Sequence, residues 1–173
     1  MGPTAGQSPV SAAGLAVPPA GVKLAFDVGQ RRIGVAACDR QASLAFPVAT
    51  VDARDPWDEL ARLVLEYRPT ALVVGRPITL AGADGIAAGR IAAWAGELAA
   101  RSGLGVWLVD ERMTTAEAAR KLRQAGRSAK QQRLIVDQQA AVAILETVLA
   151  AERAGRGVGL WVEPDEDSSK EDA

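Results

Sequence analysis

Short apolar runs separated by polar turns open the chain. Residues 22–26, 32–38 and 45–51 each carry an apolar run of strand length. The glycine turn at Gly29 predicts that the first two runs form a hairpin. We therefore expect an antiparallel three-strand unit at the start of the fold.

The pattern then changes to helices that alternate with buried strands. Residues 56–67 have helical spacing, and a second helix is expected to end near Arg101. The continuous apolar runs at 71–75 and 105–112 are typical of buried parallel strands. The predicted buried positions on the two helices are Trp57, Leu60, Leu63, Val64 and Tyr67 on the first, and Ile91, Trp94, Ala95 and Leu98 on the second.

Two further helices are expected in the second half. Thr114 and Glu117 form a capping box that predicts a helix ending at Gly126. The last helix is expected over 136–154, while residues 158–162 fit either a docked segment or a short strand. The predicted apolar stripe of the last helix is Ala141, Ile144, Leu145, Val148 and Leu149.

This order predicts an α/β fold with a five-stranded mixed sheet flanked by helices. Residues 1–21 are rich in Pro, Gly, Ser and Ala and are expected to be a disordered arm. The folded domain is expected over 22–155, followed by an extension with an acidic tail over 156–173. In such a sheet, ligands bind at the carboxyl ends of the parallel strands.

Composition narrows the chemistry. The 173 residues include no histidine and one cysteine, Cys38. This excludes a Ser-His-Asp triad, a Cys-His pair and every histidine zinc site. Carboxylates remain as acid, base or metal ligands, and their oxygens suit hard cations such as Mg²⁺ or Mn²⁺. The single cysteine and the lack of a signal segment or membrane span indicate a cytoplasmic protein.

Charge is unevenly distributed along the chain. The net charge is −1, but residues 163–173 hold six of the 21 acidic residues. The stretch 112–133 is strongly basic, and Glu117 is its one acidic residue. Such an excess fits either a polyanionic partner or a solvated helical face.

Three carboxylates fall at the predicted site. Asp27 ends the first strand, Glu111 ends the last, and Asp137 lies in the first turn of the expected final helix. Taken singly, Asp27 fits a turn residue, Glu111 a salt-bridge partner and Asp137 a helix cap. Together they would repel each other unless a cation lies among them. A hydrolytic centre with one or two metal ions that acts on a phosphodiester is a coherent interpretation.

The same blocks resemble a known family. The segments "LAFDVGQRRIGVAACD", "VVGRPITLAG", "VDERMTTAEA" and "VDQQAAVAIL" are similar to four blocks of the YqgF/RuvX family, in the same order from about Lys23 to Ala150. The resemblance implies an RNase H-like fold and a nuclease that matures the 5′ end of pre-16S ribosomal RNA. Some members of that family are discussed as Holliday junction resolvases.

The resemblance also implies site residues. Asp27, Glu111 and Asp137 match the family's acidic positions and would be catalytic ligands of Mg²⁺ or Mn²⁺. The chain departs from the family's usual residues at Gln30, Arg76 and Gln138, and Arg76 could contact phosphate or pair with Asp27 or Glu111. The expected nucleic-acid-binding residues are Arg31, Arg32, Arg76, Arg112, Arg123, Arg127, Lys130 and Arg133.

Four functions are compatible with this sequence. The first is a metal-dependent endonuclease that matures pre-16S ribosomal RNA, and the second is a resolvase of branched DNA that acts as a homodimer. The third is a non-catalytic RNA- or protein-binding module. The fourth, an ATP-binding actin-like domain, is disfavoured because a second glycine-rich phosphate loop is missing from the sequence.

Overall fold

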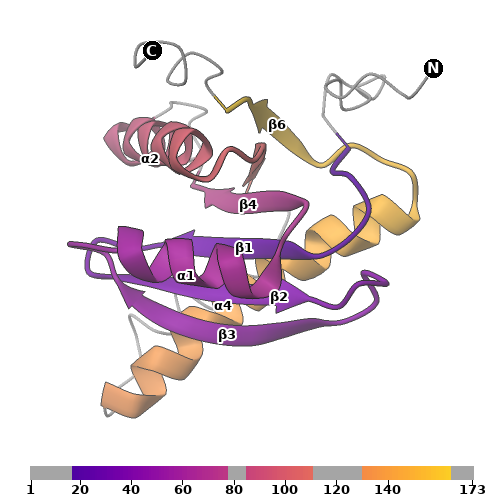
Figure 1. Cartoon of the computed structure of the whole chain (residues 1–173). Coiled ribbons are helices and arrows are strands. Elements are labelled where there is room, and N and C mark those ends of the chain that lie inside the picture. The colour runs from indigo at the N-terminus through magenta and orange to yellow at the C-terminus, as the bar shows by residue number, and fades with distance from the viewer. Residues whose placement is uncertain (1–16, 78–84, 111–129, 165–173) are drawn as a thin grey trace.

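A six-stranded mixed sheet forms the centre of the protein, with strand order β3-β2-β1-β4-β5-β6 (Figure 1). The computed structural model describes residues 17–77, 85–110 and 130–164. The strands are β1 (Lys23–Val28), β2 (Arg32–Cys38), β3 (Ala45–Asp52), β4 (Ala71–Arg76), β5 (Val106–Asp110) and β6 (Gly159–Val162). The helices are α1 (Trp57–Tyr67), α2 (Ile86–Ser102) and α4 (Lys130–Arg153).

Strand direction divides the sheet into three parts. β1, β2 and β3 are antiparallel neighbours, which confirms the predicted three-strand unit. β1, β4 and β5 run parallel, so their carboxyl ends lie at one edge of the sheet. β6 pairs with β5 in the antiparallel direction.

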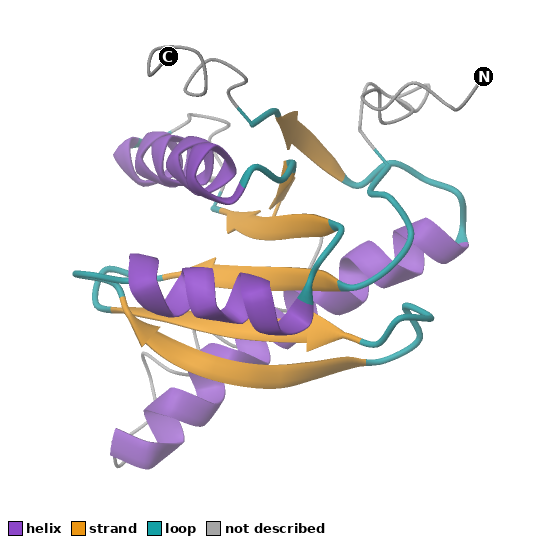
Figure 2. Ribbon diagram, viewed as in Figure 1, coloured by secondary structure: helices purple, strands orange, loops and turns teal. Residues whose placement is uncertain are grey.

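Helices cover both faces of the sheet (Figure 2). α1 and α2 lie on one face, over a core that includes Phe26, Val35 and Val74. α4 lies on the other face, over a second core that includes Ala25, Ala36 and Val73. Successive residues of a strand point to opposite faces, so each strand contributes to both cores. Among the described helices, none combines the length and apolar character that crossing a membrane requires.

Small residues mark the face of the sheet that α4 covers. On β2, Ile33, Val35 and Ala37 point towards α1 and α2, whereas Ala36 and Cys38 point towards α4. Gly34 shares that second face, and a Cβ added to it would collide with the main-chain carbonyl group of Asp137 in α4. The absence of a side chain at this position therefore allows α4 to lie directly against β2.

A buried ion pair fixes the other end of α4. The Nζ atom of Lys23, whose side chain has no exposed surface, lies 2.8 Å from Oε2 of Glu152 near the end of α4. It also donates a hydrogen bond to the carbonyl of Gly21 at 3.1 Å. Removing one partner of such a pair leaves the other charge buried and unpaired. The pair therefore holds this end of α4 against β1.

Two of the sequence expectations change. The sheet has six strands and not five, because residues 159–162 add a short antiparallel strand to β5. α4 begins at Lys130, six residues before the expected start at 136, since the polar residues of its first turns carry no apolar stripe. The helix expected from Thr114 to Gly126 lies outside the described residues. The apolar stripe predicted for the last helix is confirmed as buried.

The contact at Gly34 yields a first testable prediction. Gly34→Ala should destabilise the protein by about 3 kcal/mol or more, because the new methyl group meets backbone that cannot rotate away. Gly96→Ala in α2 is the matched control, since a Cβ there has no heavy atom of a neighbouring element within 4 Å. The control should be stabilising by about 0.5–1 kcal/mol. Urea unfolding measures both, and equal stabilities of the two variants would contradict the close approach of α4.

Candidate active site

Asp27 lies within β1, as the fifth of its six residues, and pairs with Gly34 of β2. The interpretation of Asp27 as a turn residue is therefore wrong. The residue is 3% exposed. Because Phe26 packs against α1 and α2 while Ala25 packs against α4, alternation places Asp27 on the α4 face. A carboxylate buried to this extent requires compensation by charge or hydrogen bonds.

Asp137 reaches the same place from α4. Its carbonyl occupies the space above Gly34, and Gly34 is the direct cross-strand partner of Asp27. Directly paired residues have Cβ positions about 4.5–5.5 Å apart on one face of the sheet. Asp27 and the backbone of Asp137 are therefore neighbours across Gly34, and the two predicted acidic residues that the structure describes lie together.

The position of Asp137 on its helix differs from the sequence expectation. α4 begins at Lys130, so Asp137 lies about two turns into the helix and not in the first turn. The favourable effect of a helix dipole on a carboxylate falls off within the first turn. The interpretation of Asp137 as a helix cap is therefore wrong, and another interaction must compensate its charge.

Arg32 supplies that interaction. Its Nε donates a hydrogen bond to Oδ2 of Asp137 at 2.7 Å. The Asp137 side chain is 11% exposed, whereas that of Arg32 is 37% exposed. Arg32 is on β2, two residues before Gly34, and so on the same face of the sheet. An arginine expected to bind phosphate is thus an ion-pair partner of a candidate metal ligand.

A hydrogen bond that the sequence did not suggest extends this contact. Nε2 of Gln138 donates to Oγ1 of Thr50 at 3.0 Å. Thr50 is the partner of Gly34 on β3, so Asp27, Gly34 and Thr50 form one row across three strands. Gln138 therefore anchors α4 to the end of this row.

Arg76 lies on the other face of the sheet. Its neighbour Val74 packs against α1 and α2, and alternation gives Arg76 the same direction. Its strand partner on β5 is Asp110, which alternates with Leu108 on that face. The structure thus brings Arg76 to the same edge of the sheet as Asp27, but not to the same face.

The remaining predicted site residues are described in part. Arg31 lies in the hairpin turn and is exposed. Lys130 and Arg133 are in the first turns of α4, and their side chains are not described. Those outside the described residues are Glu111, Arg112, Arg123 and Arg127.

The described part of the site fits a divalent cation in its donor chemistry. Asp27 and Asp137 offer carboxylate oxygens, the ligands that Mg²⁺ and Mn²⁺ prefer. Within the ranges that the structure describes, no three acidic, cysteine or histidine side chains stand together as a complete ligand set. Glu111, the third predicted ligand, follows β5 directly and falls outside those ranges.

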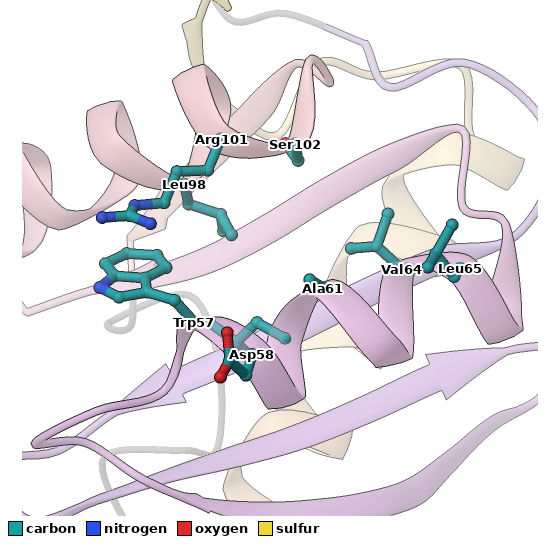
Figure 3. Close-up of a pocket in the computed structure, with 9 residues that line it drawn as sticks. Trp57, Asp58, Ala61, Val64, Leu65, Leu98, Arg101 and Ser102 are labelled. Carbon is teal, nitrogen blue, oxygen red and sulfur yellow. The ribbon is translucent and has the colours of Figure 1, made fainter.

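A groove of about 460 Å³ lies between α1 and α2, away from the carboxylates (Figure 3). Trp57, Val64 and Leu98 give it apolar walls, and the guanidinium of Arg101 stacks 4.5 Å above the Trp57 ring. Asp58 is the acidic residue in its lining. This groove is on the face of the sheet opposite Asp27 and offers no set of groups for hydrolysis.

Comparison with known proteins finds relatives along most of the chain. A family model described as "RuvX: Holliday junction resolvase" matches residues 21–151. A protein of Cutibacterium acnes named "Putative pre-16S rRNA nuclease" is 50% identical over 138 residues, which cover 79% of this chain and 86% of that protein. A protein of Streptomyces coelicolor with the same name is 47% identical and covers 83% and 89% of the two chains.

Solved structures match in fold. RuvC of T. thermophilus in complex with a Holliday junction substrate superposes with a TM-score of 0.51 at 17% identity, covering 81% of this chain and 99% of that one. A second Thermus thermophilus RuvC structure has a TM-score of 0.50. This similarity confirms the RNase H-like fold.

The Arg32–Asp137 contact yields a second prediction. A double-mutant cycle with Arg32→Gln and Asp137→Asn, in EDTA, should give a coupling of about 1 kcal/mol, because a hydrogen bond between charged groups outweighs an exposed pair. Arg54 and Asp52 form the matched control, as an exposed pair 2.6 Å apart at the end of β3. Their coupling should be smaller because solvent screens it. Equal coupling in the two cycles would show that burial gives the site pair no special strength.

Proposed function

The chain belongs to the RuvX family, and from this membership and the paired aspartates we propose that it is a metal-dependent endonuclease of precursor 16S ribosomal RNA. It is a hydrolase that acts on phosphodiester bonds, as its nuclease relatives and its family indicate. The observation that carries the proposal is the position of two buried carboxylates, Asp27 and Asp137, on one face of the sheet across Gly34.

Asp27, Asp137 and Glu111 would hold Mg²⁺ or Mn²⁺. When bound, the metal activates water and stabilises the leaving oxygen of the phosphodiester. Val109 packs on the α4 face, and Glu111 follows it by two residues. The proposal therefore requires that the alternation of β5 continues one residue beyond Asp110, which would direct Glu111 to the same face as Asp27.

The chain's basic residues would hold the nucleic acid. Arg31 and Arg32 stand at the hairpin beside the carboxylates, and the sequence after β5 is strongly basic. Contacts of this kind bind phosphates without reading sequence, so affinity should fall steeply as salt is raised. A cytoplasmic location follows from a ribosomal RNA substrate and is part of the same proposal.

Cleavage of a four-way DNA junction is the second candidate function. The description of the matching family and the fold shared with RuvC favour it. Symmetric cutting of two strands requires two active sites, and therefore a homodimer. The RNA substrate is preferred because the relatives at 47–50% identity carry the name of a pre-16S rRNA nuclease.

A cleavage assay tests the proposal. The protein is incubated with Mg²⁺ or Mn²⁺ and either a precursor 16S RNA fragment or a four-way DNA junction, with EDTA as a blank. We expect RNA cleavage that Asp27→Asn reduces by at least about 100-fold, since even groups that support metal ligands cost 10–100-fold when removed. Asp58→Asn, an exposed acid on the opposite face, is the matched control and should cleave normally.

The substrates separate the alternatives. Cleavage of the junction alone would replace the RNA function with the resolvase function. If the protein cleaves neither substrate, or if Asp27→Asn cleaves as fast as the unmodified protein, the proposed mechanism is wrong and a non-catalytic binding module is the better description.

A further inference from the structure

Arg32 is attached to Asp137 by the inner nitrogen of its guanidinium group. The bond from Nε to Oδ2 is 2.7 Å long, and within the described ranges no other hydrogen bond joins the Arg32 side chain to the protein. An arginine carries five N–H donors, four of them on the two terminal nitrogens. With 37% of the side chain exposed, these terminal donors are accessible to a phosphate from solution.

The backbone of Arg32 cannot move with its side chain. Its carbonyl accepts a hydrogen bond from the amide of Gly29 at 2.9 Å, which closes the hairpin. On its other side Arg32 pairs with Asp52 of β3. A change of partner at Arg32 therefore involves the side chain alone, and exposed side chains rotate rapidly.

The positive charge of Arg32 affects metal binding at the neighbouring carboxylates. Asp27 and Asp137 are both less than 10% exposed, and the guanidinium of Arg32 is bonded to Asp137. A divalent cation at the same carboxylates would lie close to the guanidinium, and like charges in a poorly solvated site repel strongly. A phosphate that binds the terminal donors of Arg32 would remove this repulsion.

We infer that Arg32 couples the binding of metal to the binding of nucleic acid. It neutralises Asp137 in the metal-free protein and weakens metal binding in the absence of nucleic acid. Once a phosphate of the nucleic acid is bound, Arg32 strengthens metal binding. This inference rests on the proposed metal site. The arginine is a positioning residue, which favours assembly of the metal centre on substrate over binding of metal from solution. By linkage, the metal must raise the affinity for nucleic acid by the same factor.

Titration with Mn²⁺, followed by the electron paramagnetic resonance signal of unbound Mn²⁺, tests this without any measurement of activity. The titration is made alone and with an RNA duplex that stays intact in the cleavage assay. Without RNA, Arg32→Gln should bind Mn²⁺ at least about fivefold more tightly than the unmodified protein, the lower end of common coupling factors. RNA should tighten Mn²⁺ binding by the unmodified protein at least about fivefold, and this factor should approach one in Arg32→Gln.

Two control variants isolate the charge. Arg32→Lys keeps the positive charge and should not gain Mn²⁺ affinity. Arg54→Gln removes an arginine paired with an exposed aspartate on the neighbouring strand and should leave Mn²⁺ affinity unchanged. Thermal unfolding in EDTA identifies any variant that is not folded. If Arg32→Gln does not fold, the absence of any effect of RNA on Mn²⁺ binding by the unmodified protein still overturns the coupling.

The outcomes are distinct. Equal or weaker Mn²⁺ binding by Arg32→Gln, or no effect of RNA on the unmodified protein, overturns the coupling while leaving the metal site in place. If Asp27→Asn binds Mn²⁺ as tightly as the unmodified protein, the metal site of the proposed function is wrong, and the coupling is wrong with it.

Discussion

The contact between α4 and β2 at Gly34 is the constraint on which the site depends. Side chains normally separate a helix from the sheet on which it packs, and a residue without a Cβ allows direct contact of the two backbones. Here the carbonyl of Asp137 occupies the space above Gly34. Since Gly34 is also the partner of Asp27, one missing side chain lets the backbone at Asp137 approach the strand that pairs with Asp27, although the two residues are 110 positions apart in the chain.

That proximity creates an electrostatic problem with a specific local solution. Asp27 and Asp137 are both nearly buried, so their charges must be compensated within the protein. Arg32 compensates one of them through a direct hydrogen bond. The Lys23–Glu152 pair at the far end of α4 holds the helix in register, so the spacing at the site is supported from both ends.

The sequence predicted the layered fold because its apolar periods are regular. It also predicted the three acidic residues, two of which the structure describes, because the lack of histidine leaves few other catalytic groups. The start of α4 was missed because residues 130–133 are all polar, and β6 was left open because four residues give too short a pattern. The Arg32–Asp137 bond joins positions 105 residues apart, which no local pattern encodes. The run of small residues at Gly34, Ala36 and Cys38 was a readable signal for the close helix.

The central claim is that Asp27 and Asp137 bind one divalent cation. Anomalous diffraction from crystals grown with Mn²⁺ tests it most directly. The account predicts a single strong peak within about 2.0–2.6 Å of a carboxylate oxygen of both residues, the range for hard cations and oxygen ligands. A peak bound to neither residue or to Asp137 alone, or no peak with the Arg32–Asp137 bond intact at saturating Mn²⁺, would contradict it.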